Sequence, residues 1–329
     1  MKKIFITILA AAIAMVNTIN CFAATENTDT ALKNTAEYII KTNENPSVGS
    51  VGGDWAVFAL KSAGYGDEAY FEKYYKNAEN YIKENKGVLS TRKYTEYSRT
   101  VIAMTAIGKN PADIGGCNLL TPLGDYEKTV WQGINGPVWA LIALDCGGYE
   151  MPVNKDAKIH ATRDMYIKYI LDSQCRDGGW SLSGNKITSD IDITAMTLQA
   201  LAPYTDRLNV RIAVNKGVSL LAKRQAASGG YFAWGSENCE SVAQVITALT
   251  MLGIDINDTR FVKNGKGLYD ALMGFYIKDG GFKHSAADTV PNPMATEQGL
   301  YALAAIKNRQ AGGKGIYRIK SVQPLEKAA

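Results

Sequence analysis

The sequence predicts an all-α protein that forms a single closed (α/α)6 toroid of six helical hairpins. Three observations predict this fold: a short peptide recurs at equal spacing, helical patterns flank each copy, and two kinds of helix alternate along the chain. Self-similarity at a fixed period is typical of repeat folds. It therefore outweighs the alternative of two ordinary domains, which 329 residues would also allow.

The recurring peptide ends in Gly-Gly-aromatic. Three copies align without gaps, at residues 174–180, 225–231 and 276–282. Glycine tolerates the positive φ angles of a tight corner, and the aromatic ring after it is expected to fill the gap between two layers of helices. The structural residues of the repeat are Gln174, Gly178, Gly179, Trp180, Gly229, Gly230, Tyr231, Gly280, Gly281 and Phe282.

Each corner separates two helices of different character. The first helix of each pair carries Lys, Glu, Asn and Asp on one face, and it is expected at 31–42, 70–84, 126–131, 159–171, 214–223 and 268–276. The second is rich in Ala, Val, Leu, Met and Thr nearly all round, and it is expected at 54–60, 97–107, 138–144, 193–201, 242–249 and 295–303. A helix that is apolar on most faces belongs inside. A closed ring buries these second helices, whereas an open superhelix would expose one of their faces.

The first residues of the chain have the pattern of a secretory signal peptide. Lys2 and Lys3 precede an apolar run over 4–16, and small residues near Ala23 predict cleavage after that position. Lipidation of Cys21 is the alternative. The expected organisation is a signal peptide at 1–23, the toroid at 24–308 and a C-terminal tail at 309–329. No later run is apolar enough for a membrane anchor, so the mature protein is expected to be secreted, with association at the cell surface as an alternative.

Charge and cysteine content limit the function only broadly. The 36 Lys and Arg residues nearly balance the 32 Asp and Glu residues, which argues against a nucleic-acid partner. Four cysteines follow the leader, namely Cys117, Cys146, Cys175 and Cys239. They allow two disulfides in three possible pairings, or four free buried thiols, and both alternatives stay open.

The peptide Gln174-x-x-Asp-Gly-Gly-Trp180 resembles the QW motif of squalene and hopene cyclases and of protein prenyltransferase β subunits. Residues 52–60, 190–204, 241–249 and 280–284 are more similar to secreted bacterial prenyltransferase and squalene oxidase repeat proteins, which are related to transcobalamin and intrinsic factor. The resemblance covers roughly residues 30–308. It implies an α/α toroid of six hairpins.

The resemblance also identifies the catalytic groups to look for. Class II cyclases use an Asp-x-Asp-Asp motif, and Asp190-Ile-Asp192 matches its start, with Ile193 in the fourth position. Asp192, with Asp190 beside it, would be the acid of a cyclase-like enzyme. Alternatively, both residues cap a helix. Prenyltransferases hold zinc through Asp, Cys and His, where this chain has Ser228, Gly230 and Ala295, so neither a metal nor a cofactor is expected.

Four acidic residues, Asp54, Asp192, Glu240 and Glu297, lie where second helices begin. Second helices of like hairpins run parallel, so these carboxylates are expected to share one rim. Paired carboxylates in a cleft are typical of glycan-cleaving enzymes, although helix capping explains each one singly. The two histidines, His160 and His284, are expected on the surface, on a first-helix pattern and a loop respectively.

Without a complete catalytic motif, a non-enzymatic binding or scaffold module is expected, with a cyclase-like or glycan-cleaving enzyme as the alternative. Its ligand would be an unknown small molecule, peptide or glycan. Transcobalamin-like relatives hold a corrinoid between the toroid and a β domain, which the residues after 308 are too few to form, so a partner chain would have to complete that site. Candidate ligand-binding residues are Asp54, Trp55, Tyr97, Arg99, Trp139, Asp192, Glu240, Gln244, Glu297 and Gln298.

Overall fold

Helices of two concentric layers alternate along the chain, which is described at residues 28–278 and 280–319 of a computed structural model. The expected signal peptide lies outside the described residues. The inner helices are α2 (Trp55–Ala63), α4 (Thr95–Ala106), α6 (Asn135–Cys146), α8 (Ile191–Leu201), α10 (Cys239–Met251) and α12 (Pro293–Gln310). The outer helices are α1, described over 28–42, α3 (Glu68–Glu84), α5 (Tyr126–Val130), α7 (Arg163–Asp172), α9 (Leu208–Arg224) and α11 (Leu268–Met273).

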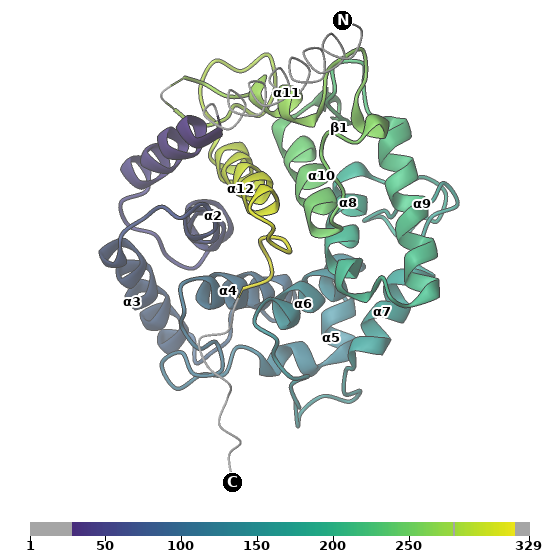
Figure 1. The fold of residues 1–329 in the computed structure, drawn as a ribbon. Coiled ribbons are helices and arrows are strands. Elements are labelled where there is room, and N and C mark those ends of the chain that lie inside the picture. The colour runs from purple at the N-terminus through teal and green to yellow at the C-terminus, as the bar shows by residue number, and fades with distance from the viewer. Residues whose placement is uncertain (1–27, 279, 320–329) are drawn as a thin grey trace, which may run out of the picture.

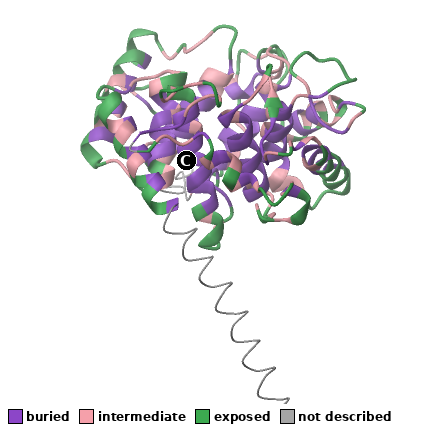
Figure 2. Cartoon of the chain, turned by 90° about the horizontal axis from the view of Figure 1, so that it is seen from above, coloured by how far each residue is buried: buried purple, intermediate pink, exposed green. Residues whose placement is uncertain are grey.

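The inner helices close into a ring. Each one packs against the next, and α12 packs against α2, so the last hairpin meets the first (Figure 1). Buried residues fill the inner helices, and the exposed ones lie mostly on the outer helices and loops (Figure 2). The predicted closed toroid is confirmed, and the open superhelix is wrong. The physical reason is the one that the composition gave, since helices that are apolar nearly all round need neighbours on every side.

Short elements complete the ring. A two-residue hairpin pairs β1 (Phe232–Ala233) with β2 (Ser236–Glu237), and irregular turns precede α2 at Ser50–Asp54 and lie at Thr121–Gly124, Ala202–Tyr204 and Thr259–Phe261. Side-chain caps fix where several helices begin. Thr162 accepts from the backbone N–H of Met165, so α7 begins at Arg163, several residues later than expected. His160 therefore precedes this outer helix, where it pairs with Asp125 in an isolated bridge, instead of lying on the helix.

The Gly-Gly-aromatic corners have a structural role. The Gln174 amide donates to the carbonyl oxygens of Gly178 at 2.8 Å and Ala213 at 2.9 Å, and so joins the corner to α9. Gln225 makes the equivalent pair of bonds one repeat later. The three corner aromatics, Trp180, Tyr231 and Phe282, are fully buried between the layers, as predicted.

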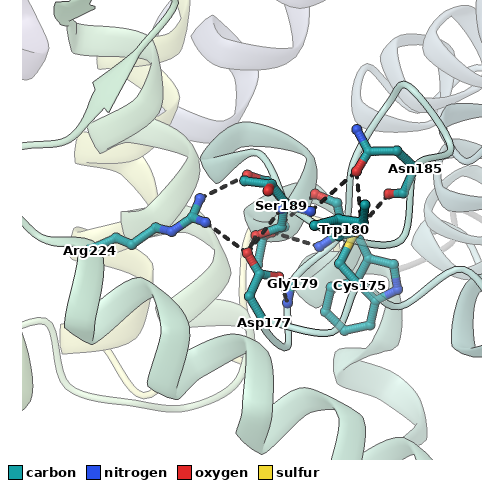
Figure 3. A network of polar contacts seen from close by, with 10 residues as sticks. Cys175, Asp177, Gly179, Trp180, Asn185, Ser189 and Arg224 are labelled. Atoms are coloured by element: carbon teal, nitrogen blue, oxygen red, sulfur yellow. Dashed lines mark hydrogen bonds and ion pairs between the residues drawn. The ribbon is translucent and has the colours of Figure 1, made fainter.

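The second glycine of the corner is required by close packing. A Cβ atom on Gly179 would lie 2.5 Å from Thr194 Oγ1, the atom that accepts the Trp180 N–H. Figure 3 shows the surrounding network, in which Asp177 accepts from the Gly179 N–H and forms an ion pair with Arg224 at 2.7 Å. Asp177 and Arg224 therefore hold the corner together and are not candidates for ligand binding, because their polar atoms already bond to residues of the corner.

The segment after α12 packs into the ring, so the boundary expected at 309 does not separate a free tail. Ile316 and Tyr317 are buried, and the Ile319 N–H donates to the Cys146 carbonyl at the end of α6. All four cysteines of the described chain are free thiols, and Cys146, Cys175 and Cys239 are buried. None of the described helices is long and apolar enough to cross a membrane.

Candidate functional site

The first turns of the inner helices meet at one rim, which we call the mouth of the toroid. The Gly52 N–H, just before α2, donates to Oε1 of Glu297, which lies near the start of α12, at 2.6 Å. Arg99 in α4 reaches Asp54 at the start of α2. Cys239 Sγ, at the start of α10, contacts the Ala295 carbonyl of α12 at 3.7 Å. Helices whose first turns touch in this way run parallel, as the repeat pattern predicts.

One half of the mouth is a closed polar network around Asp54. Its carboxylate is fully buried and accepts from Arg99 Nε at 2.7 Å, from Thr100 Oγ1 at 3.2 Å and from the Tyr74 hydroxyl. Arg99 also donates to Glu96 at 2.5 Å. Both oxygens of Asp54, and the Nε and Nη2 atoms of Arg99, thus bond to other residues of the protein. These two predicted ligand-binding residues instead join α2 to α3 and α4.

Glu297 lies beside this network and is nearly fully buried. Burial raises the pKa of its carboxyl to about 8, the Gly52 N–H opposes that rise, and the negative charge of Asp54 adds to it. Glu297 is therefore a neutral carboxylic acid near pH 7. A neutral acid retains one O–H donor, which an ionised carboxylate lacks.

The other half of the mouth holds Asp192, whose Oδ1 atom is buried with no hydrogen-bond partner in the described part of the chain. Burial raises the pKa of Asp192 to about 6, the nearby Ser241 hydroxyl opposes that rise, and Asp190 and Glu240 add to it. Asp190 itself caps α8, accepting from the Ile193 N–H at 3.0 Å. Capping therefore accounts for Asp190 alone, and one oxygen of the carboxyl two residues later is left without a partner.

His284 lies near Asp192, on a partly exposed loop, as the sequence predicts. Its Nδ1 atom is 2.8 Å from Glu240 Oε2, and its carbonyl accepts from the Cys239 N–H at 2.9 Å. The loop that carries His284 is thereby fixed to the start of α10. Glu240 thus occupies the Nδ1 atom of an imidazole side chain that is 44% exposed. The position of His284 just after the Gly280-Gly281-Phe282 corner could have placed it at the mouth, since each corner leads into an inner helix.

Two exposed aromatic side chains flank this half of the mouth. Phe232 and Trp234, on the β1–β2 hairpin, are 62% and 81% exposed. The hairpin packs against α8 and is tied to the start of α10 by Asn238, whose side-chain amide donates to the Ala233 carbonyl at 3.3 Å. Trp234 has a φ of 56°, an unusual angle for a bulky residue that tends to persist at functional sites. Neither Phe232 nor Trp234 was among the ligand-binding residues predicted from the sequence.

The remaining candidates lie inside the ring. Gln244 donates to Gln298 Oε1 at 3.0 Å and to the Tyr301 hydroxyl at 2.5 Å, and it accepts from Gln199 at 2.9 Å. This chain of amides joins α8, α10 and α12 below the mouth, so Gln244 is occupied by the protein.

Aromatic candidates are likewise engaged. The Tyr97 hydroxyl accepts from the Leu89 N–H and donates to the Ser90 carbonyl, so it fastens a loop. The rings of Trp55 and Trp139 contact each other at 5.0 Å, and Trp55 is the one left half-buried at the mouth. Within 28–278 and 280–319, no group of three or more His, Cys, Asp or Glu side chains could hold a metal ion.

The fold itself is that of known α/α toroid enzymes. No protein-family model matches the chain, and no curated protein matches it. The type II terpene cyclase MstE from Scytonema, in complex with merosterolic acid A, is 13% identical with a TM-score of 0.54, over 87% of this chain and 99% of that one. The unsaturated glucuronyl hydrolase of Bacillus sp. GL1, responsible for the degradation of glycosaminoglycan, is 14% identical with a TM-score of 0.54, over 90% and 98% of the two chains.

These likenesses define the class of protein as an α/α toroid. At such low identity they show the fold alone. The two neighbours carry out unrelated reactions, so a shared fold does not choose between them. The function has to be argued from the side chains at the mouth.

Proposed function

We propose that the mouth of this toroid binds a carbohydrate chain, on the side formed by α8, α10 and the β1–β2 hairpin. The observation that carries the proposal is a combination of side chains: Phe232 and Trp234 are exposed, one oxygen of Asp192 has no hydrogen-bond partner, and Glu240 orients the imidazole of His284. Sugar rings present flat C–H faces that pack on aromatic rings, and their hydroxyl groups donate to carboxylates and accept from or donate to imidazole.

The filled interior supports a ligand that lies across the mouth. Below the rim, Gln244, Tyr301 and Phe58 are buried and packed against one another or their neighbours. A long apolar ligand would need this space, whereas a chain of sugars can lie along a surface groove and engage only the rim. The proposal thus keeps the ligand-binding role inferred from the sequence and replaces its ligand residues on the Asp54 side with those around Asp192.

Cleavage of the bound chain is a second candidate, favoured by one observation. Asp192 has a pKa raised to about 6 and an unpaired oxygen, so below that pH it is a carboxylic acid able to give up a proton. In a hydrolytic step, Asp192 would protonate the glycosidic oxygen as the C–O bond breaks. His284 Nε2 would take a proton from the water that forms the new C–O bond, with Glu240 holding the imidazole in place.

The location of the protein is proposed from the sequence of the first 23 residues. The charged, apolar and small-residue segments over 1–23 support export, so we propose that the mature toroid acts outside the membrane, in the medium or at the cell surface. Polysaccharides are abundant there. This agrees with a carbohydrate ligand, and the nearly balanced charge of the chain gives no reason to propose a nucleic acid.

The test is a binding panel with a matched control. The chain from residue 24 onward would be titrated calorimetrically with oligosaccharides, with cobinamide and a farnesyl alcohol as competing ligand classes. Trp234→Ala is expected to weaken glycan binding at least about tenfold, the equivalent of roughly 1.4 kcal/mol. Trp131→Ala is the control, because Trp131 is also exposed but lies between α5 and α6, where Arg92 packs over its ring, and not on the β1–β2 hairpin.

Three results would contradict the proposal. Cobinamide or farnesyl alcohol binding in place of any glycan would replace the ligand class. Equal losses in both Trp variants would remove the α8 side as the site. Finally, the wild type could release sugar products at pH 5.5, and Asp192→Asn could abolish this release while still binding the glycan. That result would show that the protein cleaves glycans and does not only bind them.

A further inference from the structure

The interior of the ring contains a side chain that belongs to none of the six hairpins. After α12, the Gly315 N–H donates to Asn308 Oδ1 at 3.0 Å, and the chain turns back under the inner helices (Figure 1). Tyr317 then enters the ring. Its aromatic ring stacks on Phe58, with centroids 4.9 Å apart and planes at 5°, and meets Trp139 edge-on at 6.3 Å and 78°.

This ring is the lowest member of an aromatic column that reaches the mouth. Phe58 contacts Trp55 at 6.0 Å, and Trp55 contacts Trp139 at 5.0 Å. Trp55 stands in the first turn of α2 and is half-buried at the mouth. Tyr317 has two ring partners, Phe58 and Trp139, and both also contact Trp55 at the rim. Movement of Tyr317 can therefore alter the packing of Trp55 at the mouth.

Tyr317 fills its slot imperfectly. Its hydroxyl oxygen is buried, and no hydrogen-bond partner reaches it from the described residues. A buried polar group without a partner loses its bonds to water and gains none in return. The backbone on either side is tied to the ring by the bonds from Gly315 to Asn308 and from Ile319 to the Cys146 carbonyl. The flat slot between Phe58 and Trp139 thus holds the ring of Tyr317, which stacks well but leaves its hydroxyl group without a hydrogen bond.

We propose that this slot is a binding pocket for a planar, uncharged aromatic group of a ligand, and that Tyr317 is its resident occupant, displaced when the ligand binds. The slot selects a flat ring because Phe58 offers a parallel face and Trp139 an edge. It selects an uncharged one because both of these walls are apolar. The pocket is separate from the carbohydrate site, which uses the rim around Asp192.

Displacement makes a quantitative prediction about affinity. A ligand that has to expel Tyr317 binds more weakly than its intrinsic affinity by the fraction of molecules in which the slot is open. With p-cresol as the probe, Tyr317→Ala is expected to bind at least about tenfold more tightly than the wild type. Tyr317→Phe keeps the stacked ring and removes the unpaired hydroxyl, so the phenylalanine ring is expected to stay in the slot more stably than the tyrosine ring does. It is expected to bind p-cresol more weakly than the wild type.

Release of the tail gives an independent measurement. Arg318 follows Tyr317 directly, so trypsin can cut after it once the segment leaves the ring. Saturating p-cresol is expected to speed this cleavage in the wild type at least about twofold when cleavage follows the open population. In Tyr317→Phe, the acceleration is expected to be smaller at the same probe concentration.

The decisive result is that of the wild type. If p-cresol neither binds it nor speeds cleavage after Arg318, Tyr317 is a fixed part of the core, and binding by Tyr317→Ala reports only an engineered cavity. If Tyr317→Ala fails to fold, the wild type and Tyr317→Phe still decide the question through affinity and cleavage. Loss or retention of glycan binding leaves this result unaffected, because the two sites are probed by different ligands.

Discussion

Asp54 and Asp192 stand at the same rim of the same repeat fold, yet their surroundings are opposite. Asp54 is fully buried, with Arg99, Thr100 and Tyr74 donating to it. Asp192 retains an oxygen that no described residue contacts through a hydrogen bond. Both carboxyls have left bulk water, but only the first has exchanged its water contacts for protein ones.

The difference shows how a repeat protein can divide one rim between stability and binding. The Asp54 half joins three helices through a buried ion pair, so the Asp54 carboxylate is already bonded to protein groups. The Asp192 half leaves a carboxyl, an oriented imidazole and two aromatic side chains unsatisfied or exposed. An unpaired buried polar group is costly, and natural proteins retain such groups mainly where they have a function.

The largest expected effect comes from exchanging each carboxylate for an amide. Asp54→Asn removes the fully buried carboxylate that pairs with Arg99 and leaves that guanidinium only its bond to Glu96, so the free energy of unfolding is expected to fall by roughly 3–5 kcal/mol. Asp192→Asn removes a charge that burial disfavours and whose Oδ1 atom makes no hydrogen bond, so stability at pH 7 is expected to stay within about 0.5 kcal/mol or to rise. Urea unfolding of both variants measures this. Equal losses would mean that the two halves of the mouth do not differ as described.

A smaller effect is expected from Glu297, through its pH dependence. A raised carboxyl pKa means that the folded state holds its proton more tightly than the unfolded state does. The associated stability is fully present below about pH 4.5 and is lost as pH rises towards about 8. Glu297→Gln stays neutral throughout. From pH 5 to pH 8 the wild type should lose at least about 1.4 kcal/mol relative to this variant, the equivalent of one pKa unit. Parallel stability curves would show that Glu297 is ionised in the folded protein.

The smallest effect separates the two neighbouring acids of α8. Asp190→Ala removes a helix cap and is expected to cost about 1 kcal/mol. Asp192→Ala removes no hydrogen bond made by Oδ1 and is expected to cost less, although it should weaken ligand binding more. Thermal unfolding together with the glycan titration measures both quantities. The reverse order of stability losses would identify Asp192 as the structural residue.

Much of the ring could be predicted because its signals are local. The Gly-Gly-aromatic spacing places the corners, and helix composition separates the inner layer from the outer one. Asp192 and Glu240 could be placed at the mouth for the same reason, since each begins an inner helix. The Glu240–His284 contact could not be predicted in the same way, because it joins residues 44 positions apart across different repeats.

The sequence by itself determined a closed ring of six hairpins, because apolar periodicity and corner chemistry are encoded within each repeat and add up along the chain. Only the tertiary structure decided which acids are neutralised and what fills the interior. Whether Asp54 finds Arg99 while Asp192 finds no partner, and whether Tyr317 lies on Phe58, depends on side chains that meet across the ring. Such contacts depend on which side chains lie close together in space, and the spacing of residues along the chain does not determine this.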